Sequence, residues 1–173
     1  LASFFNLNES DKRHYIFAAP LAGFNYYDKL MLGGIIHNYT LPAERFQFLL
    51  APLYGTGSKQ INGLGSMSYS WYPGNDGMKA VLSVAGATFS GDSFTDSSLT
   101  KNYQRYSKLV PSFKIVFANE NPRSQMLKYL QWKTFFIQEQ ALRFTWDSIN
   151  NTEILSFPFE NRYVNQLRVV IEN

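Results

Sequence analysis

The stretch "GSMSYSWYPGNDG", residues 65–77, alternates small hydroxyl side chains with large apolar ones and then enters a turn. The two alternating sets are serines and large apolar residues: Ser66, Ser68, Ser70 and Met67, Tyr69, Trp71. Successive side chains of a β-strand point to opposite faces, so this pattern predicts a strand with a serine face and an aromatic face. The Pro-Gly-Asn-Asp-Gly sequence that follows has the composition of a turn.

Similar segments occur along the whole chain, separated by turn-forming sequences. The expected strands are residues 26–39, 45–56, 62–72, 79–91, 107–119, 127–140 and 162–172, with 141–147 as a shorter strand or the end of the one before it. Residues 120–144 also have some helical periodicity, but their aromatic and β-branched content favours a strand. Many of these segments have 11–14 residues, whereas globular strands usually have about five or six.

The separators are expected to alternate in length. "TLPAE", "PGNDG" and "NENPRS" are short, whereas "GDSFTDSSLTKNYQRY" and "SINNTEILSFPFEN" are long. We predict a single all-β domain over residues 1–173, in which residues 1–14 form a lead-in.

Composition excludes several classes of protein. The chain of 173 residues contains no cysteine, which excludes disulfide scaffolds and cysteine-bound metals. A net charge of +3 is too small to indicate a nucleic-acid partner. No apolar run is long enough for a transmembrane helix, and the first residues lack the pattern of a signal peptide.

The position of the charged residues is the most informative feature. Seven strand segments (30–37, 46–57, 64–73, 80–90, 109–118, 129–137 and 163–171) contain three charged residues among 69, namely Lys114, Lys133 and Arg168. The 17% charged content of the chain would give about 12. A soluble antiparallel sheet usually places charged residues on its wet face. We therefore expect one apolar face and one weakly polar face.

This combination is typical of an outer-membrane β-barrel, and we predict an antiparallel barrel of about seven or eight long strands that forms part of a larger barrel. The residues expected to face lipid or its interface are Tyr26, Tyr27, Leu30, Leu32, Met67, Tyr69, Trp71, Phe113, Ile115, Phe117, Trp132, Leu167 and Val169. The residues expected to face the lumen are Ser66, Ser68, Ser70, Lys114 and Arg168.

A soluble β-barrel or sandwich is the alternative, because alternation with a period of two fits both. In that case five of the large side chains would point inward, toward an apolar ligand or a neighbouring catalytic domain: Met67, Tyr69, Trp71, Phe113 and Phe117.

Three charged residues lie within the strand segments, namely Lys114, Lys133 and Arg168. If they face the lumen of a barrel, we expect them to pair with Glu139, Glu172 or water, and a role in selectivity is the second hypothesis for them.

Three segments resemble a known family: "NYYDKLMLG" at 25–33, "LAPLYGTGSK" at 50–59 and "NPRS" at 121–124. The chain resembles the C-terminal barrel region of large Bacteroidetes-type proteins whose N-terminal part is a gluzincin, thermolysin-like metallopeptidase. The resemblance extends over about two thirds of the chain. It implies a bacterial outer-membrane location, lipid as a partner, and a barrel that anchors a peptidase domain located upstream.

The chain departs from such a peptidase in its chemistry. The HExxH zinc-binding motif is absent, and neither His14 nor His37 has a neighbouring glutamate. "GTGSK" at 55–59 has the wrong spacing for a phosphate loop and is expected to form a hairpin turn. Asp28 is expected to be a turn or rim carboxylate, and His37 a hydrogen-bonded residue at a strand end. We predict a non-enzymatic membrane anchor or scaffold without catalytic, metal or cofactor sites.

Overall fold

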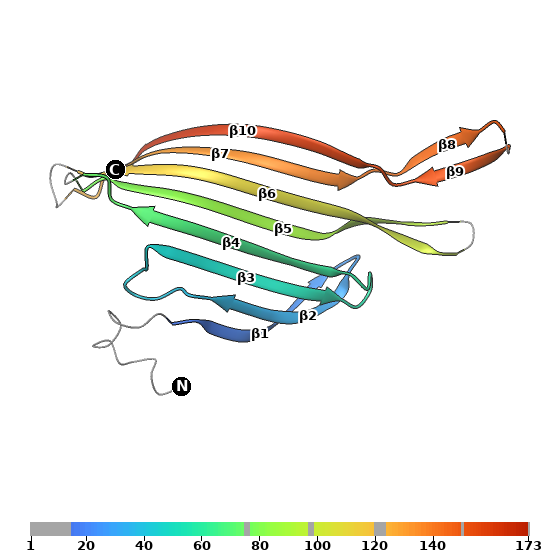
Figure 1. Ribbon diagram of the computed structural model, residues 1–173, viewed down its shortest axis with the longest axis horizontal. Helices are drawn as coiled ribbons and strands as arrows, with labels where there is room; N and C mark the ends of the chain where they lie inside the picture. The colour runs from blue at the N-terminus through green and yellow to red at the C-terminus, as the bar shows by residue number, and fades with distance from the viewer. Residues whose placement is uncertain (1–14, 75–76, 97–98, 120–123, 150, 173) are drawn as a thin grey trace.

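The computed structural model describes residues 15–74, 77–96, 99–119, 124–149 and 151–172, and they form one curved eight-stranded sheet with a smaller hairpin (Figure 1). The strands of the sheet lie in chain order: β1 (Phe17–Asn25), β2 (Lys29–His37), β3 (Phe46–Gly55), β4 (Ile61–Trp71), β5 (Lys79–Thr95), β6 (Lys101–Phe117), β7 (Leu127–Gln140) and β10 (Phe159–Glu172). Between β7 and β10 the chain forms a hairpin of β8 (Arg143–Asp147) and β9 (Thr152–Ser156).

The prediction of an all-β, antiparallel protein is confirmed, since every neighbouring pair of strands is antiparallel. The sheet is open: among the described residues, β1 pairs with β2 alone and β10 pairs with β7 alone. Each strand reverses direction relative to the last, so β1 and β10 run in opposite directions.

Strand β1 was not predicted from the sequence. Its segment "FAAPLAGFN" is rich in alanine and glycine and contains Pro20, all of which are unfavourable in strands. The proline is tolerated because β1 is an edge strand, where a missing N–H costs no ladder hydrogen bond on the open side. The expected strand at 26–39 begins later, at Lys29, because Tyr26 and Tyr27 form the β1–β2 turn.

The two segments predicted to be long separators contain strands instead of long loops. Most of "GDSFTDSSLTKNYQRY" lies in β5 and β6, which have 17 residues each and extend past the β3–β4 turn (Figure 1). A register shift between Ser90 and Asp92 places a bulge in β5 where this extension begins. The other separator forms the β8–β9 hairpin, so Arg143–Asp147 does not continue β7.

Two prolines interrupt the ladders inside the sheet. Beside Pro52 the β2–β3 pairing lapses between Gly33 and Ile36, and beside Pro111 the β6–β7 pairing lapses between Leu109 and Ser112. Proline has no N–H to donate, so one ladder bond is lost at each position. The remaining pairs keep the same register on both sides of each gap.

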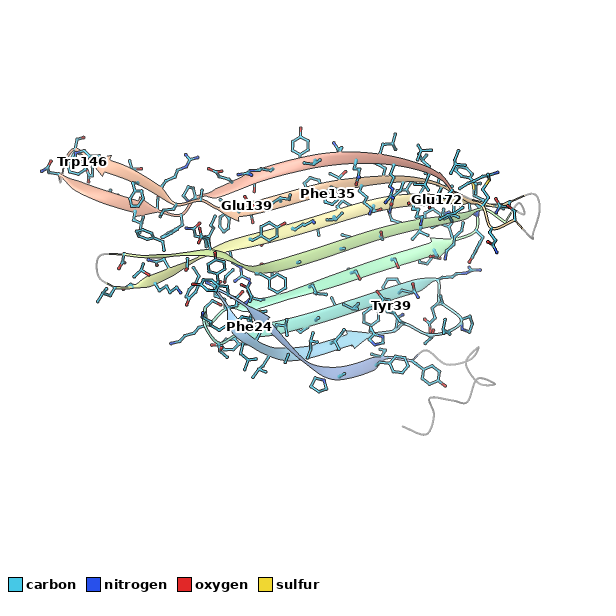
Figure 2. All side chains as sticks on the ribbon, turned by 180° about the vertical axis from the view of Figure 1, so that it is seen from behind. Phe24, Tyr39, Phe135, Glu139, Trp146 and Glu172 are labelled. Atoms are coloured by element: carbon cyan, nitrogen blue, oxygen red, sulfur yellow. The ribbon has the colours of Figure 1, made fainter. Side chains whose placement is uncertain are left out.

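The sheet forms a single layer with almost no hydrophobic core of its own. The buried apolar residues among those described are Met31, Ala51, Leu53 and Ala80. Side chains project from both faces, and no second layer of ribbon covers either one (Figure 2). A chain of this length normally buries a large core, so the faces of the sheet are suited to contact something other than this chain.

Candidate functional site

The register of the strands sorts the side chains into two faces. Residues directly opposite each other in an antiparallel pair lie on the same face. Met67 pairs with Phe48 and Val84, and Tyr69 pairs with Phe46 and Leu82. This face, which we call the apolar face, continues through Phe113, Trp132 and Leu167 on the next strands.

All strand residues of the predicted lipid-facing set lie on the apolar face. They are Leu30, Leu32, Met67, Tyr69, Trp71, Phe113, Ile115, Phe117, Trp132, Leu167 and Val169. Most are well exposed, with 47% of the surface of Met67 and 69% of that of Leu167 accessible. Tyr26 and Tyr27 lie in the β1–β2 turn, outside the strands.

The opposite face, which we call the polar face, contains all five residues predicted to face a lumen. Ser66, Ser68 and Ser70 alternate with the apolar residues of β4, and Ser70 pairs with Val81. Val81 in turn pairs with Lys114, which pairs with Gln131, which pairs with Arg168. One row of paired residues therefore connects Ser70 on β4 with Lys114 and Arg168, the two cations predicted to face a lumen.

The apolar residues of the apolar face stop at a row of polar residues that crosses four strands. Thr88, Ser107, Gln138 and Asn161 pair across β5, β6, β7 and β10. Thr88 and Ser107 share a hydroxyl hydrogen bond of 3.0 Å, and Gln138 Nε2 donates to Asn161 Oδ1 at 3.1 Å. We call this row the polar belt.

Arg105 lies next to the polar belt and contacts three polar groups. Its Nη1 donates to Gln60 Oε1 at 2.9 Å, its Nη2 donates to the Ile61 carbonyl at 2.5 Å, and its Nε donates to Thr88 Oγ1 at 3.3 Å. A guanidinium with this many acceptors holds the start of β4 against β5.

Aromatic side chains gather at the opposite end of the apolar face. The rings of Tyr69 and Trp71 stack with centroids 6.1 Å apart, and the ring of Phe113 lies 6.1 Å from that of Trp71. Phe46 and Phe48 make a further contact at 6.0 Å. Such pairs stabilise beyond their area by about 1 kcal/mol each, so this end of the face is an ordered aromatic cluster.

A buried carboxylate connects the β1–β2 turn to distant strands. Asp28 is fully buried, and its Oδ1 accepts hydrogen bonds from Ser58 Oγ at 2.5 Å and from Ser90 Oγ at 2.6 Å. Its Oδ2 accepts from the backbone N–H of Ser90 at 3.0 Å and from Asn25 Nδ2 at 3.2 Å. Burial alone raises the pKa of Asp28, but these donors outweigh it and hold the pKa below its ordinary value.

This cluster pairs with the backbone of Ser90 on β5. The ladder between β4 and β5 begins at Gly63 and Thr88, two residues short of Ser90, so β4 does not pair with Ser90. Asp28 accepts from the Ser90 N–H, and Asn25 Nδ2 donates to the Ser90 carbonyl at 3.1 Å. Both backbone groups of Ser90 are therefore paired by side chains at the β1–β2 connection, more than 60 residues earlier, which ties that connection to β5.

Two hairpins project beyond the polar belt, on the same side of the sheet (Figure 1). They are the extended β5–β6 hairpin and β8–β9, and they touch where the rings of Phe94 and Phe144 meet edge to face at 5.8 Å. Trp146 lies near the tip of β8–β9 (Figure 2).

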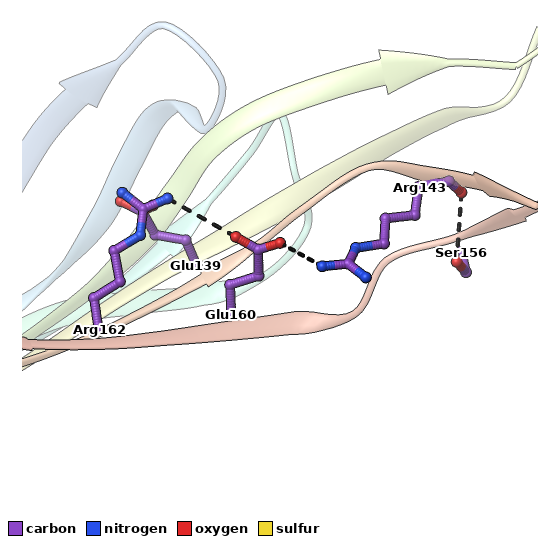
Figure 3. Close-up of polar contacts among 5 residues, drawn as sticks. All are labelled: Glu139, Arg143, Ser156, Glu160 and Arg162. Atoms are coloured by element: carbon purple, nitrogen blue, oxygen red, sulfur yellow. Dashed lines mark hydrogen bonds and ion pairs between the residues drawn. The ribbon is translucent and has the colours of Figure 1, made fainter.

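Ion pairs connect the β8–β9 hairpin to β10. Arg143 Nη2 lies 2.9 Å from Glu160, while Arg162 Nη2 lies 3.5 Å from Glu139 and 3.8 Å from Glu160 (Figure 3). Ser156 Oγ donates to the Arg143 carbonyl at 3.4 Å. These groups are largely exposed, so they orient the hairpin more than they stabilise it.

The structure answers several of the sequence predictions about single residues. Residues 55–59 form the β3–β4 turn as expected, with Lys59 N–H donating to the Gly55 carbonyl at 2.9 Å. His37 is hydrogen-bonded, since its Nδ1 accepts from the Tyr39 N–H at 3.2 Å. Asp28 lies in a turn as expected, but it is buried rather than at an exposed rim. His14 lies outside the described residues.

The partners of Asp28 were missed because they come from distant parts of the chain. Only "NYYD" carries a local signal, since Asn25 Oδ1 accepts the Tyr27 N–H in an Asx turn. Ser58 and Ser90 resemble other turn and strand serines in sequence. Asn62 is also buried beside them, and its neighbours Ile61 and Gly63 give no signal in the sequence that its amide lies inside.

Within the described ranges, no three histidine, aspartate or glutamate residues are grouped so as to hold a metal ion. The described residues also contain no helix with the length and apolar character required to cross a membrane. The resemblance to the barrel regions of gluzincin proteins stays a prediction. Comparisons of the chain with models of protein families, with curated proteins and with solved structures found no match.

Proposed function

We propose that this chain is the wall of a bacterial outer-membrane β-barrel and acts as a membrane anchor or scaffold without catalysis of its own. The apolar face contacts lipid, and the polar face lines the interior. The observation that carries the proposal is the extended apolar face, which crosses the sheet from β2 to β10 and is covered by no other part of the described chain. One polar pair interrupts it, Thr134 and Asn165, and the two side chains hydrogen-bond to each other at 2.7 Å. An exposed apolar surface of this extent marks an interface.

The dimensions of the apolar face support a lipid contact. On β6 it runs from Leu109 to Phe117, nine residues, before Ser107 of the polar belt. A tilted membrane strand needs about 9–11 residues to cross the hydrocarbon region. The aromatic cluster at one end and the polar belt at the other correspond to the two interfaces of a membrane.

The proposal also requires that the two open edges of the sheet be paired in the membrane. Every backbone group in lipid needs a hydrogen-bond partner, and each unpaired one costs several kcal/mol. β10 has 14 residues whose outer edge has no partner strand among the described residues. We infer that this edge and that of β1 are paired in the membrane-embedded protein.

Two neighbouring substitutions on β4 test the proposal. Met67→Lys puts a charge on the apolar face, and Ser68→Lys puts the same charge on the polar face. In phospholipid vesicles we expect Met67→Lys to lower the free energy of unfolding by about 2–4 kcal/mol. Ser68→Lys, the matched control, should change it by less than about 1 kcal/mol. Urea titration followed by tryptophan fluorescence measures both.

The opposite result identifies the soluble alternative. A chain that stays monodisperse without detergent, and in which Met67→Lys is as costly in that buffer as in vesicles, does not place Met67 in lipid. The apolar face would then be covered by protein, as in a soluble barrel or a sheet packed on a neighbouring domain.

A further inference from the structure

We propose that the polar face carries an oxyanion-binding patch formed by Lys114, Lys133 and Arg168. Its ligand class is a multiply charged oxyanion, such as a phosphate group. The proposal is independent of membrane anchoring, because it concerns the face of the sheet that does not contact lipid.

The three cations come from three strands, and the register gathers them. Lys114 lies on β6, Lys133 on β7 and Arg168 on β10. One row of the polar face reads Lys114, Gln131, Arg168, and the adjacent row reads Ser112, Lys133, Gln166. Between the row of Lys108, Ile137 and Arg162 and the Glu172 end of β10, the charges that β6, β7 and β10 place on the polar face are those of Lys114, Lys133 and Arg168. They fall in two neighbouring rows of that face.

Tyr129 holds two of these cations together. Lys114 Nζ lies 4.1 Å from the centroid of the Tyr129 ring, and Arg168 Cζ lies 6.0 Å from the same centroid. Two cations that share one ring repel each other, while the ring attracts each of them. The ring fixes their positions but does not neutralise their charge.

The acidic residues expected to neutralise the patch lie elsewhere. Glu139 contacts Arg162 rather than Lys133 and lies six positions from Lys133 on β7, about 20 Å along the strand. Glu172 is four residues from Arg168, about 13 Å away along β10. Figure 2 shows Glu139 and Glu172 toward opposite ends of the sheet.

The ion pairs among the described residues include none of the three cations. Of the partners expected from the sequence, which were Glu139, Glu172 or water, Glu139 pairs with Arg162 instead (Figure 3). Lys79 adds to the excess of positive charge, since it begins β5 on the same face, one row beyond Lys114.

The remaining polar groups of the patch donate hydrogen bonds. Gln131 Nε2 donates to Ser112 Oγ at 3.1 Å, which leaves the Ser112 hydroxyl proton for another acceptor. Gln166 carries an amide directly opposite Lys133. Ser112 itself is buried, so the groups available to a ligand are two ammonium groups, a guanidinium fork and an amide, which complement the several oxygens of a phosphate group.

Binding of pyrophosphate to the refolded full chain in zwitterionic detergent, at low ionic strength, tests the patch. We expect Lys133→Gln to weaken binding about tenfold, the loss of one charge-assisted hydrogen bond. Lys128→Gln is the matched control, because it removes the same charge from the same strand on the apolar face. Arg168→Gln, on the exposed edge strand, provides a second variant that does not depend on packing around β7.

A second arm uses phosphatidylglycerol vesicles to distinguish a lipid headgroup from a free phosphate. Binding of either probe that needs Lys133 and Arg168 but not Lys128 supports the patch, and the probe that binds identifies the source. Absence of binding to both, or equal affinities in Lys133→Gln and Lys128→Gln, overturns it. Neither outcome depends on Met67→Lys, so this test and that of membrane anchoring fail separately.

Discussion

The two ends of the sheet differ in how their strands are held. Around the β1–β2 turn, side chains from four separate segments pack together, and Met31, Leu53 and Asn62 are buried beside Asp28. Along β10, nearly every side chain is exposed on both faces. The N-terminal strands therefore carry their own packing, whereas β10 depends on one ladder and on whatever contacts it from outside.

The largest expected effect comes from closing the space between β2 and β3. A Cβ at Gly33 would overlap the Pro52 carbonyl oxygen and lie 3.0 Å from Leu53 Cα, both backbone atoms that cannot move aside. We expect Gly33→Ala to cost about 3 kcal/mol or more. The measurement is urea unfolding of the refolded protein in detergent.

Gly34→Ala is the control for this substitution. A Cβ there has one neighbour within 4 Å, the Ala19 carbonyl oxygen at 3.4 Å, which is an ordinary contact. Equal unfolding midpoints for the two variants would mean that β2 and β3 are not packed as closely as the structure has them.

A pair of leucines compares the two regions directly. Leu53 on β3 is 6% exposed, and Leu167 on β10 is 69% exposed. We expect Leu53→Ala to lower the free energy of unfolding by about 2–5 kcal/mol, and Leu167→Ala by about 1 kcal/mol or less. If Leu167→Ala proves as costly as Leu53→Ala, β10 is covered by a partner strand or domain under the conditions of the measurement.

The smallest effect concerns pH and the buried carboxylate. The pKa of Asp28 is lowered from 3.8 in the folded state, so its contribution to stability is complete above that value and is lost as pH falls through the folded pKa. We expect the urea concentration at the midpoint of wild-type unfolding to fall when the pH is lowered below about 4. The midpoint of Asp28→Asn should be lower than that of the wild type at neutral pH, and it should change less as the pH falls.

Asp92→Asn provides the control for pH, because Asp92 is exposed and its Oδ1 accepts the N–H of the next residue alone among the described contacts. This variant should follow the wild-type pH profile. If it loses the acid dependence as well, the titrating group is not the one that holds the β1–β2 turn.

The sequence was sufficient for the features that depend on local alternation. The strand class, the position of the 55–59 turn and the division of β4 into two faces all follow from neighbouring residues. It was insufficient where distant residues meet. Strand β1 has poor intrinsic propensity and forms because β2 pairs with it.

The candidate sites show the same limit. Lys114, Lys133 and Arg168 stand out in the sequence as isolated charges, but their proximity depends on a register that turn lengths set across three strands. Asp28 stands out less, because its donors Ser58 and Ser90 lie 30 and 62 residues away. Neither set of sequence separations follows the periodicity of a strand or a helix, so the sequence alone does not indicate that these residues meet.

The opposed directions of β1 and β10 constrain the size of any closed barrel. Edges that run in opposite directions can pair directly as an antiparallel ladder, and they remain compatible after the insertion of two, four or any even number of hairpin-linked strands. An odd number of inserted strands forces one parallel neighbour. The circumference of such a closed barrel would therefore grow in steps of one hairpin, and two copies joined edge to edge would satisfy the same parity.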